Sequence, residues 1–192
     1  CSVTATHTIN IKQTPVISFT SNTPVCVGSN VNFTNSSSSG IGITYNWDFG
    51  AGSVPANSTA QNPTGIKYNS SGSKTVTLTV SNEFGCSASA SATITIKSTP
   101  VASFTTTAPK CMGDTVDFNN TGTITGVNYS WVLGDGSVPD NSPNENPSGI
   151  VYSVAGIKDI TLTITDISSG CSATLTQPIT IYPKPTVLFS SN

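Results

Sequence analysis

The chain has 192 residues, of which only 8% are charged, against about 25% in a typical soluble domain. It contains 7 Lys, no Arg and 9 Asp or Glu, so it lacks the basic surface that binding to nucleic-acid phosphates requires. No apolar run approaches the roughly 20 residues that cross a membrane, and the first residues do not have the pattern of a signal peptide. With 35% hydrophobic residues and a net charge of −2, the composition is that of a folded chain rather than a disordered one.

The five cysteines point to an internal repeat of 85 residues. Cys26 and Cys86 are 60 residues apart, as are Cys111 and Cys171, and the second pair follows the first at an offset of 85. Similar segments recur near this offset: residues 15–20 match 100–105, 45–47 match 129–131, 62–66 match 146–150, and 77–79 match 161–163. The sequence therefore predicts two copies of one structural unit.

Four segments of each repeat alternate apolar residues with polar ones, mostly Ser, Thr and Asn. In chain order they are residues 31–33, 45–49, 76–80 and 92–96 in the first repeat, and 116–118, 129–133, 160–164 and 179–181 in the second. This period of two indicates half-buried strands, and turns rich in Gly, Pro, Asn and Ser separate them. About six or seven short strands per repeat predict an all-β fold of tandem antiparallel β-sandwiches.

The second of these segments leads into a glycine-rich motif, which reads WDFGAGS from Trp47 and WVLGDGS from Trp131. Together with the Tyr, Gly and Thr-Leu-Thr segments that follow in the same order, it resembles the Trp-Asp-Phe-Gly-Asp-Gly core of the polycystic kidney disease (PKD) domain. That family has an Ig-like β-sandwich fold. The resemblance covers nearly the whole chain, and each copy keeps one of the two motif aspartates, Asp48 or Asp135.

Each motif is expected to form a strand that ends in a tight turn. Its tryptophan belongs in the core, and its aspartate is expected to accept hydrogen bonds from turn amides. The motif glycines allow backbone angles that a side chain would penalise; they are Gly50, Gly52, Gly134 and Gly136. A calcium site is the alternative, but calcium takes about six to eight oxygen ligands and each motif offers one carboxylate. We therefore predict a structural role for Asp48 and Asp135, and no metal site.

The cysteines have a predicted pairing if each unit is such a sandwich. Cys26 then lies just ahead of the second strand and Cys86 at the start of the last one, and both are expected near one end of the unit. A Cys26–Cys86 bridge, and its copy Cys111–Cys171, would each close a loop of about 60 residues and contribute on the order of 4 kcal/mol. Such bridges would indicate an oxidising, extracellular compartment. Paired free thiols are the alternative.

The repeat also predicts how the chain is divided. The first repeat is expected at residues 15–99 and the second at residues 100–184. Residues 1–14 match the last strand of a repeat, so Cys1 is expected to be unpaired because of truncation. Residues 185–192 match the first strand of a following repeat. The proline-containing junctions predict stiff joints and a rod-like array in which neighbouring copies of the repeat are the main partners.

No catalytic site is predicted. His7 is the only histidine and lies in the incomplete first segment, so triads that need a histidine have no candidate. The carboxylates do not form a repeated pair, and the cysteine spacings do not suit a zinc site. The chain is therefore expected to be neither an enzyme nor a cofactor-binding protein.

The resemblance implies extracellular modules that act as spacers, adhesion units or mechanically loaded links. The cysteine pattern is similar to that of modules in very large surface proteins of Bacteroidota, including gliding adhesins. We expect a structural or adhesive segment of a cell-surface protein, with surface glycans or other filament chains as further partners. The alternatives are an accessory spacer or binding region of a secreted polysaccharide- or protein-degrading hydrolase, and a carbohydrate-binding module built on exposed aromatic residues.

Overall fold

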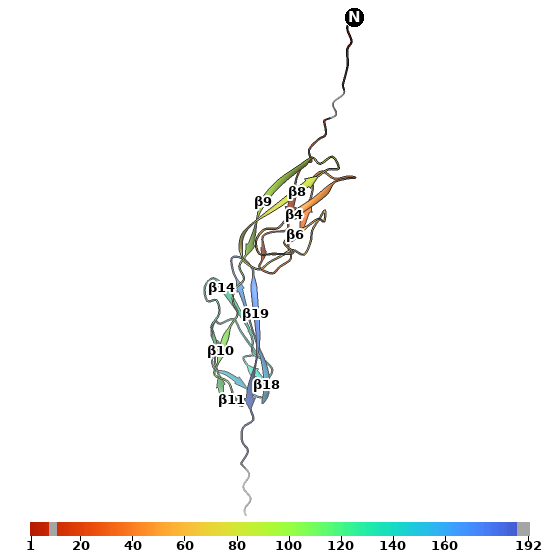
Figure 1. Cartoon of the computed structure of the whole chain (residues 1–192). Coiled ribbons are helices and arrows are strands. Elements are labelled where there is room, and N and C mark those ends of the chain that lie inside the picture. Colours follow the sequence, from red (N-terminus) through yellow and green to blue (C-terminus); the bar gives the residue numbers. More distant parts are fainter. Residues whose placement is uncertain (8–10, 188–192) are drawn as a thin grey trace, which may run out of the picture. The chain divides into compact units, whose positions relative to one another are not determined.

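The computed structural model describes residues 1–7 and 11–187. The chain divides into two compact units, Cys1–Ser98 and Thr99–Asn192 (Figure 1). The described residues form strands and turns without a helix, so the all-β prediction is confirmed. Each unit has its own hydrophobic core.

The first unit is built on one five-stranded sheet. Its strand order is β2 (Val25–Cys26), β9 (Ser87–Lys97), β8 (Gly72–Ser81), β4 (Thr44–Asp48) and β6 (Asn57–Ser58). All neighbours are antiparallel except β2 and β9, which run parallel. The long β8–β9 hairpin thus forms the centre of the sheet, and two-residue strands cover both of its edges.

Two small sheets complete the first unit. They consist of β1 (Phe19–Ser21) paired with β3 (Phe33–Asn35), and β5 (Ser53–Val54) paired with β7 (Lys67–Tyr68). An isolated bridge joins Val31 to Ile66. Phe19, Val31, Phe33, Ile66 and Tyr68 of these segments pack into the same core as the main sheet, which gives the two layers of a sandwich.

The second unit repeats this arrangement. Its five-stranded sheet has the order β11 (Lys110–Cys111), β19 (Ser172–Tyr182), β18 (Gly156–Asp166), β14 (Val127–Val132) and β16 (Asn141–Ser142), again with one parallel edge pair, β11 and β19. The smaller sheets are β10 (Phe104–Thr106) with β13 (Phe118–Asn120), and β12 (Thr115–Val116) with β17 (Ile150–Tyr152) and β15 (Ser137–Val138). The offset of the sequence repeat is therefore also the offset of the structural repeat.

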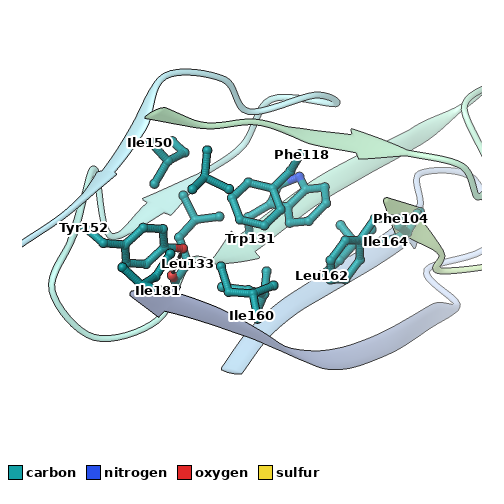
Figure 2. Packing of buried hydrophobic residues seen from close by; sticks show 12 residues of the cluster. Phe104, Phe118, Trp131, Leu133, Ile150, Tyr152, Ile160, Leu162, Ile164 and Ile181 are labelled. Atoms are coloured by element: carbon teal, nitrogen blue, oxygen red, sulfur yellow. Dashed lines mark hydrogen bonds between the residues drawn. The ribbon is translucent and has the colours of Figure 1, made fainter. Parts of the chain in front are cut away.

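A tryptophan lies at the centre of each core. Trp47 and Trp131 are both fully buried, as predicted. Phe104 meets the Trp131 ring edge-on with centroids 5.0 Å apart, and Phe118 tilts against the same ring at 5.7 Å (Figure 2). In the first unit Phe19 takes the place of Phe104, also at 5.0 Å. Edge-on aromatic pairs of this kind add to the stabilisation from buried area alone.

The two terminal segments carry no assigned strand in the part of the chain that the structure describes. Residues 1–7, 11–18 and 183–187 are extended or irregular. Residues 8–10 and 188–192 belong to the predicted flanking strands and lie outside the described residues. The membership of residues 1–14 and 185–192 in flanking repeats therefore remains a prediction.

Candidate functional site: the motif turns and the cysteine positions

The motif turn of the first unit is held by its own polar groups. The backbone amide of Gly50 donates a hydrogen bond to Oδ1 of Asp48 at 2.9 Å, and the Ser53 hydroxyl donates to the Gly50 carbonyl at 2.6 Å. At the start of the motif, Nε1 of Trp47 donates to the carbonyl of Ala60 at 2.9 Å. The Asp48 carboxylate is thus an acceptor for the turn, and the Trp47 ring is fixed by a bond to a neighbouring loop.

Gly50 is required by the path of the backbone. Its φ is +76°, in the left-handed region that favours glycine. A Cβ at this position would lie 2.5 Å from the carbonyl oxygen of Thr75 in β8. The turn therefore packs directly against the backbone of the neighbouring long strand, and no side chain fits between them.

The motif turn of the second unit keeps the same hydrogen bonds except the one that the aspartate accepts. The Ser137 hydroxyl donates to the Gly134 carbonyl at 2.7 Å, and Nε1 of Trp131 donates to the carbonyl of Asn144 at 2.9 Å. Asp135 is exposed and makes no side-chain hydrogen bond with any residue that the structure describes. The reason is positional: Asp135 corresponds to Ala51, whereas Val132 occupies the position of Asp48.

Each unit also contains a buried tyrosine that supports the motif strand. The Tyr68 hydroxyl donates to the carbonyl of Phe49 at 2.7 Å, and the Tyr152 hydroxyl donates to the carbonyl of Leu133 at 2.6 Å. Burial, together with the nearby Asp48 carboxylate, raises the pKa of Tyr68 to about 12. Burial also raises the pKa of Tyr152 to about 12. Both phenols therefore stay protonated at neutral pH and act as structural donors. Sequence analysis had not assigned a role to either tyrosine, although both recur at the repeat offset.

The described residues hold no group of side chains placed as metal ligands. Across residues 1–7 and 11–187, no group of three or more His, Cys, Asp or Glu side chains lies close enough to hold a metal ion. Asp48 and Asp135 belong to separate motif turns in separate units. The Asp48 carboxylate and the motif serines and tryptophans are instead engaged in hydrogen bonds with the backbone.

The cysteine positions contradict the predicted pairing. Cys26 lies in β2 beside Lys97, at the C-terminal end of β9, whereas Cys86 immediately precedes the N-terminal end of the same strand. At about 3.3 Å per residue, these ends are roughly 35 Å apart, while a disulfide needs Cα atoms within about 7 Å. The predicted Cys26–Cys86 bridge is therefore wrong.

The second unit gives the same result. Cys111 lies in β11 beside Tyr182, at the C-terminal end of β19, and Cys171 precedes the N-terminal end of β19. The predicted Cys111–Cys171 bridge is wrong for the same geometric reason. Cys86 and Cys111 carry free thiols, whereas Cys26 and Cys171 are both disulfide-bonded. A disulfide is thus present, as predicted, but not between the expected partners.

The outer face of each long hairpin carries hydroxyl groups in cross-strand pairs. Thr77 bonds to Ser91 at 2.9 Å and Thr79 to Ser89 at 2.8 Å across β8 and β9. The second unit has equivalent pairs across β18 and β19, Thr161 with Thr176 at 2.9 Å and Thr163 with Thr174 at 3.0 Å. These polar, uncharged ladders explain how the sheet faces solvent with so few charged residues.

Exposed aromatic side chains are scattered. Phe84 is 56% exposed, and the Lys12 ammonium lies over the Phe84 ring, 4.0 Å from the ring centroid. Tyr182 is 53% exposed. Neither tryptophan reaches the surface. The aromatic platform that a carbohydrate-binding module would need is therefore not formed by the tryptophans. No helix in the described part of the chain is long and apolar enough to cross a membrane.

Comparisons with solved structures return β-sandwich modules at low similarity. They include carbohydrate-binding modules of the β-sandwich superfamily (20% identity, covering 90% of this chain and 86% of that chain, TM-score 0.41) and fibronectin(III)-like modules of Clostridium thermocellum CbhA (12% identity, covering 91% of this chain and 100% of that chain, TM-score 0.34). A Bacteroides ovatus protein from a mixed-linkage glucan utilization locus, in complex with a mixed-linkage heptasaccharide, matches at 11% identity (88% of this chain, 48% of that chain, TM-score 0.35). Nothing about ligands follows for this chain from similarity at this level.

Sequence comparison is more specific. No curated protein matches the chain significantly. The family model of the PKD domain matches it twice in succession, over residues 12–98 and 97–181, which agrees with the twofold repetition of sheets, motif turns and cores. The chain therefore belongs to the PKD domain family and contains two PKD domains in tandem.

Proposed function

We propose that the chain is a non-catalytic structural segment of a longer extracellular protein, in which tandem PKD domains serve as spacer or fibre-forming modules. The observation that carries the proposal is the set of hydrogen bonds made by the repeated polar residues. In both units the repeated polar residues donate hydrogen bonds to backbone groups: the tryptophan to a loop carbonyl, the serine to a turn carbonyl, and the tyrosine to a carbonyl of the motif strand. These repeated residues thus maintain the fold, which supports a structural role for the motif.

The cysteine chemistry supports an extracellular compartment. Disulfides persist in oxidising environments such as the cell exterior and are rare in the cytosol. Cys26 and Cys171 are disulfide-bonded, which supports an extracellular or cell-surface location for the chain. PKD domains in an extracellular protein are suited to a role as modules that position or connect other parts.

The hydroxyl ladders indicate how such modules remain soluble and approach one another. A surface of Ser and Thr offers hydrogen bonds without strong charge, so neighbouring chains experience little electrostatic repulsion. Neighbouring repeats are the partners we propose first. Other filament chains and surface glycans, which present hydroxyl groups of their own, are the next candidates.

The native parent protein provides the test. Antibodies against this chain are expected to label intact, unpermeabilised cells and to detect a protein far larger than 19.7 kDa. Sequencing of the detected protein is expected to reveal further copies of the repeat. Detection of a native species of about 19.7 kDa would contradict the proposal. A parent protein whose remaining sequence is a hydrolase domain would instead support the accessory role in a secreted enzyme.

A further inference from the structure

The edge of β9 that faces away from β8 is largely unpaired. β9 pairs with β8 along nearly its whole length (Figure 1), whereas β2 covers only Ile96 and Lys97 on the other side. Next to these, Thr23 and Pro24 line a hollow beside the strand. Residues 87–93 remain and are called the open edge. No strand in the described part of the chain pairs with the open edge on this side.

Two hydrogen bonds identify the backbone groups that point outward from β9. The Cys86 carbonyl accepts a hydrogen bond from the Asn82 amide, on the β8 side, whereas the Lys97 carbonyl accepts one from the Val27 amide, on the β2 side. Because the hydrogen-bonding groups of successive strand residues point to opposite sides, the odd-numbered residues of β9 face away from β8. In the open edge these residues are Ser87, Ser89, Ser91 and Thr93. Each of them offers an amide and a carbonyl to a further strand.

The equivalent edge of the second unit is interrupted by a proline. The Met112 amide donates a hydrogen bond to the Tyr182 carbonyl, so the even-numbered residues of β19 face away from β18. Pro178 therefore stands at an outward position, where it has no amide to donate and its ring projects toward any incoming strand. Its equivalent in the first unit is Thr93. Proline on an edge strand prevents pairing with other chains, and the open edge lacks this protection.

We propose that the open edge pairs with the open edge of a second copy of this chain, so that two five-stranded sheets join into one continuous sheet. The two strands run antiparallel about a two-fold axis at Ala90. In this register Ser87 faces Thr93 of the second copy, and Ser89 faces Ser91 of the second copy. Every outward amide of one open edge then meets a carbonyl of the other.

The side chains of the open edge favour a copy of itself as the partner. Residues 87–93 are Ser, Ala and Thr, so the two-fold pairing places no like charges opposite each other. Lysine, which often prevents pairing at sheet edges, occurs only at Lys97, where β2 already covers the strand. The net charge of −2 adds little repulsion between two chains.

This pairing specifies one contact of the proposed function, because it is a means by which other filament chains attach. A single open edge gives a weak contact, since association has to offset the lost freedom of two molecules. Several open edges in a longer protein would act together and raise the strength of lateral association. The pairing itself is a property of this chain and can be measured without the parent protein.

Sedimentation equilibrium of the full chain tests the pairing. At concentrations up to about 1 mM we expect a reversible dimer of twice 19.7 kDa, with intermolecular disulfides excluded by non-reducing electrophoresis. Thr93→Pro copies the residue that the second unit tolerates at the equivalent position. It removes one interchain hydrogen bond per copy and adds an obstructing ring, so the dissociation constant is expected to rise at least about tenfold. A chain that stays monomeric, or a dimer that Thr93→Pro does not weaken, would overturn the inference.

Charge substitutions provide a second test that leaves the backbone unchanged. In the two-fold pairing the side chains at position 91 of the two copies are diagonal neighbours, so Ser91→Lys and Ser91→Glu are each expected to weaken the dimer about two- to fivefold. A mixture of the two variants is expected to associate more tightly than either variant alone. Thr176→Lys is the matched control, because Thr176 is the second-unit equivalent of Ser91 and lies on the edge that Pro178 protects. Equal weakening by Thr176→Lys and Ser91→Lys, or a mixture no tighter than its components, would refute the pairing. Neither outcome affects the labelling of intact cells, which tests the proposed function separately.

Discussion

Gly50 offers a test of how closely the motif turn packs against β8. Gly50→Ala places a methyl group 2.5 Å from the Thr75 carbonyl oxygen, at a φ of +76°. Gly65→Ala is a matched control, since Gly65 has a φ of +74° but no atom within 4 Å of its Cβ position. The left-handed backbone costs a non-glycine residue about 1–2 kcal/mol, and overpacking adds about 1–3 kcal/mol. We therefore expect a loss of about 1–2 kcal/mol for Gly65→Ala and about 2–5 kcal/mol for Gly50→Ala.

Calorimetry of the full chain measures this difference, because the second unit is unaltered and serves as an internal reference. For a unit of this size, about 1 kcal/mol corresponds to a shift in melting temperature of about 4–8 °C. Gly50→Ala is therefore expected to lower the melting temperature of the first unit by at least about 8 °C, and by more than Gly65→Ala does. Equal shifts for the two variants would show that the turn does not approach Thr75 as described, and the steric argument would fail.

Three further predictions concern the polar groups of the motif. Asp48→Ala removes the acceptor of the Gly50 amide and is expected to lower the free energy of unfolding by about 0.5–1.5 kcal/mol, whereas Asp135→Ala, at an exposed position, changes it by less than about 0.5 kcal/mol. Equal losses in urea titrations would contradict the assignment. Millimolar calcium is expected to leave the melting temperature unchanged, and a rise of several degrees would instead reveal a calcium site. The pKa of about 12 for Tyr68 and Tyr152 means that their contribution to stability is full below pH 10 and is lost between pH 10 and 12, because unfolded tyrosines ionise near 10. Tyr68→Phe is expected to flatten this decline in urea titrations at pH 9 to 11, and a slope equal to that of the unmutated chain would refute the explanation.

The strands of the long hairpins could be predicted from sequence because burial on one face leaves a clear period of two. Val76, Leu78 and Val80 are fully buried on β8, and Ile94 and Ile96 are buried on β9, as the alternation predicts. A strand of 10 or 11 residues repeats this signal several times. Its outer positions carry hydroxyls, so both faces of the strand are encoded in the sequence.

The two-residue edge strands could not be predicted in the same way. Neither β2 nor β6 is long enough to show a period, and each exists because a longer strand offers it free backbone groups. The hydrogen bonds of the motif turns could not be predicted from sequence either, because they depend on the exact position of each side chain in the turn. An aspartate two residues before Gly50 reaches its amide, but Asp135 is one residue after Gly134 and faces solvent. The motif sequence shows that each copy keeps an aspartate, but the position of that aspartate within the turn determines whether it can accept a hydrogen bond from a turn amide.

The cysteines illustrate why spacing alone could not select a partner. The 60-residue separation occurs once in each repeat, whereas 145 residues separate Cys26 from Cys171. Loop-closure entropy distinguishes them weakly, since it grows with the logarithm of length and differs by less than about 1 kcal/mol between the two loops. The deciding factor is the direction of β2: because it runs parallel to β9 and beside its C-terminal end, Cys26 is separated from Cys86 by the full length of that strand. The direction of this two-residue strand, which no sequence period reveals, thus rules out the pairing that the spacing favours.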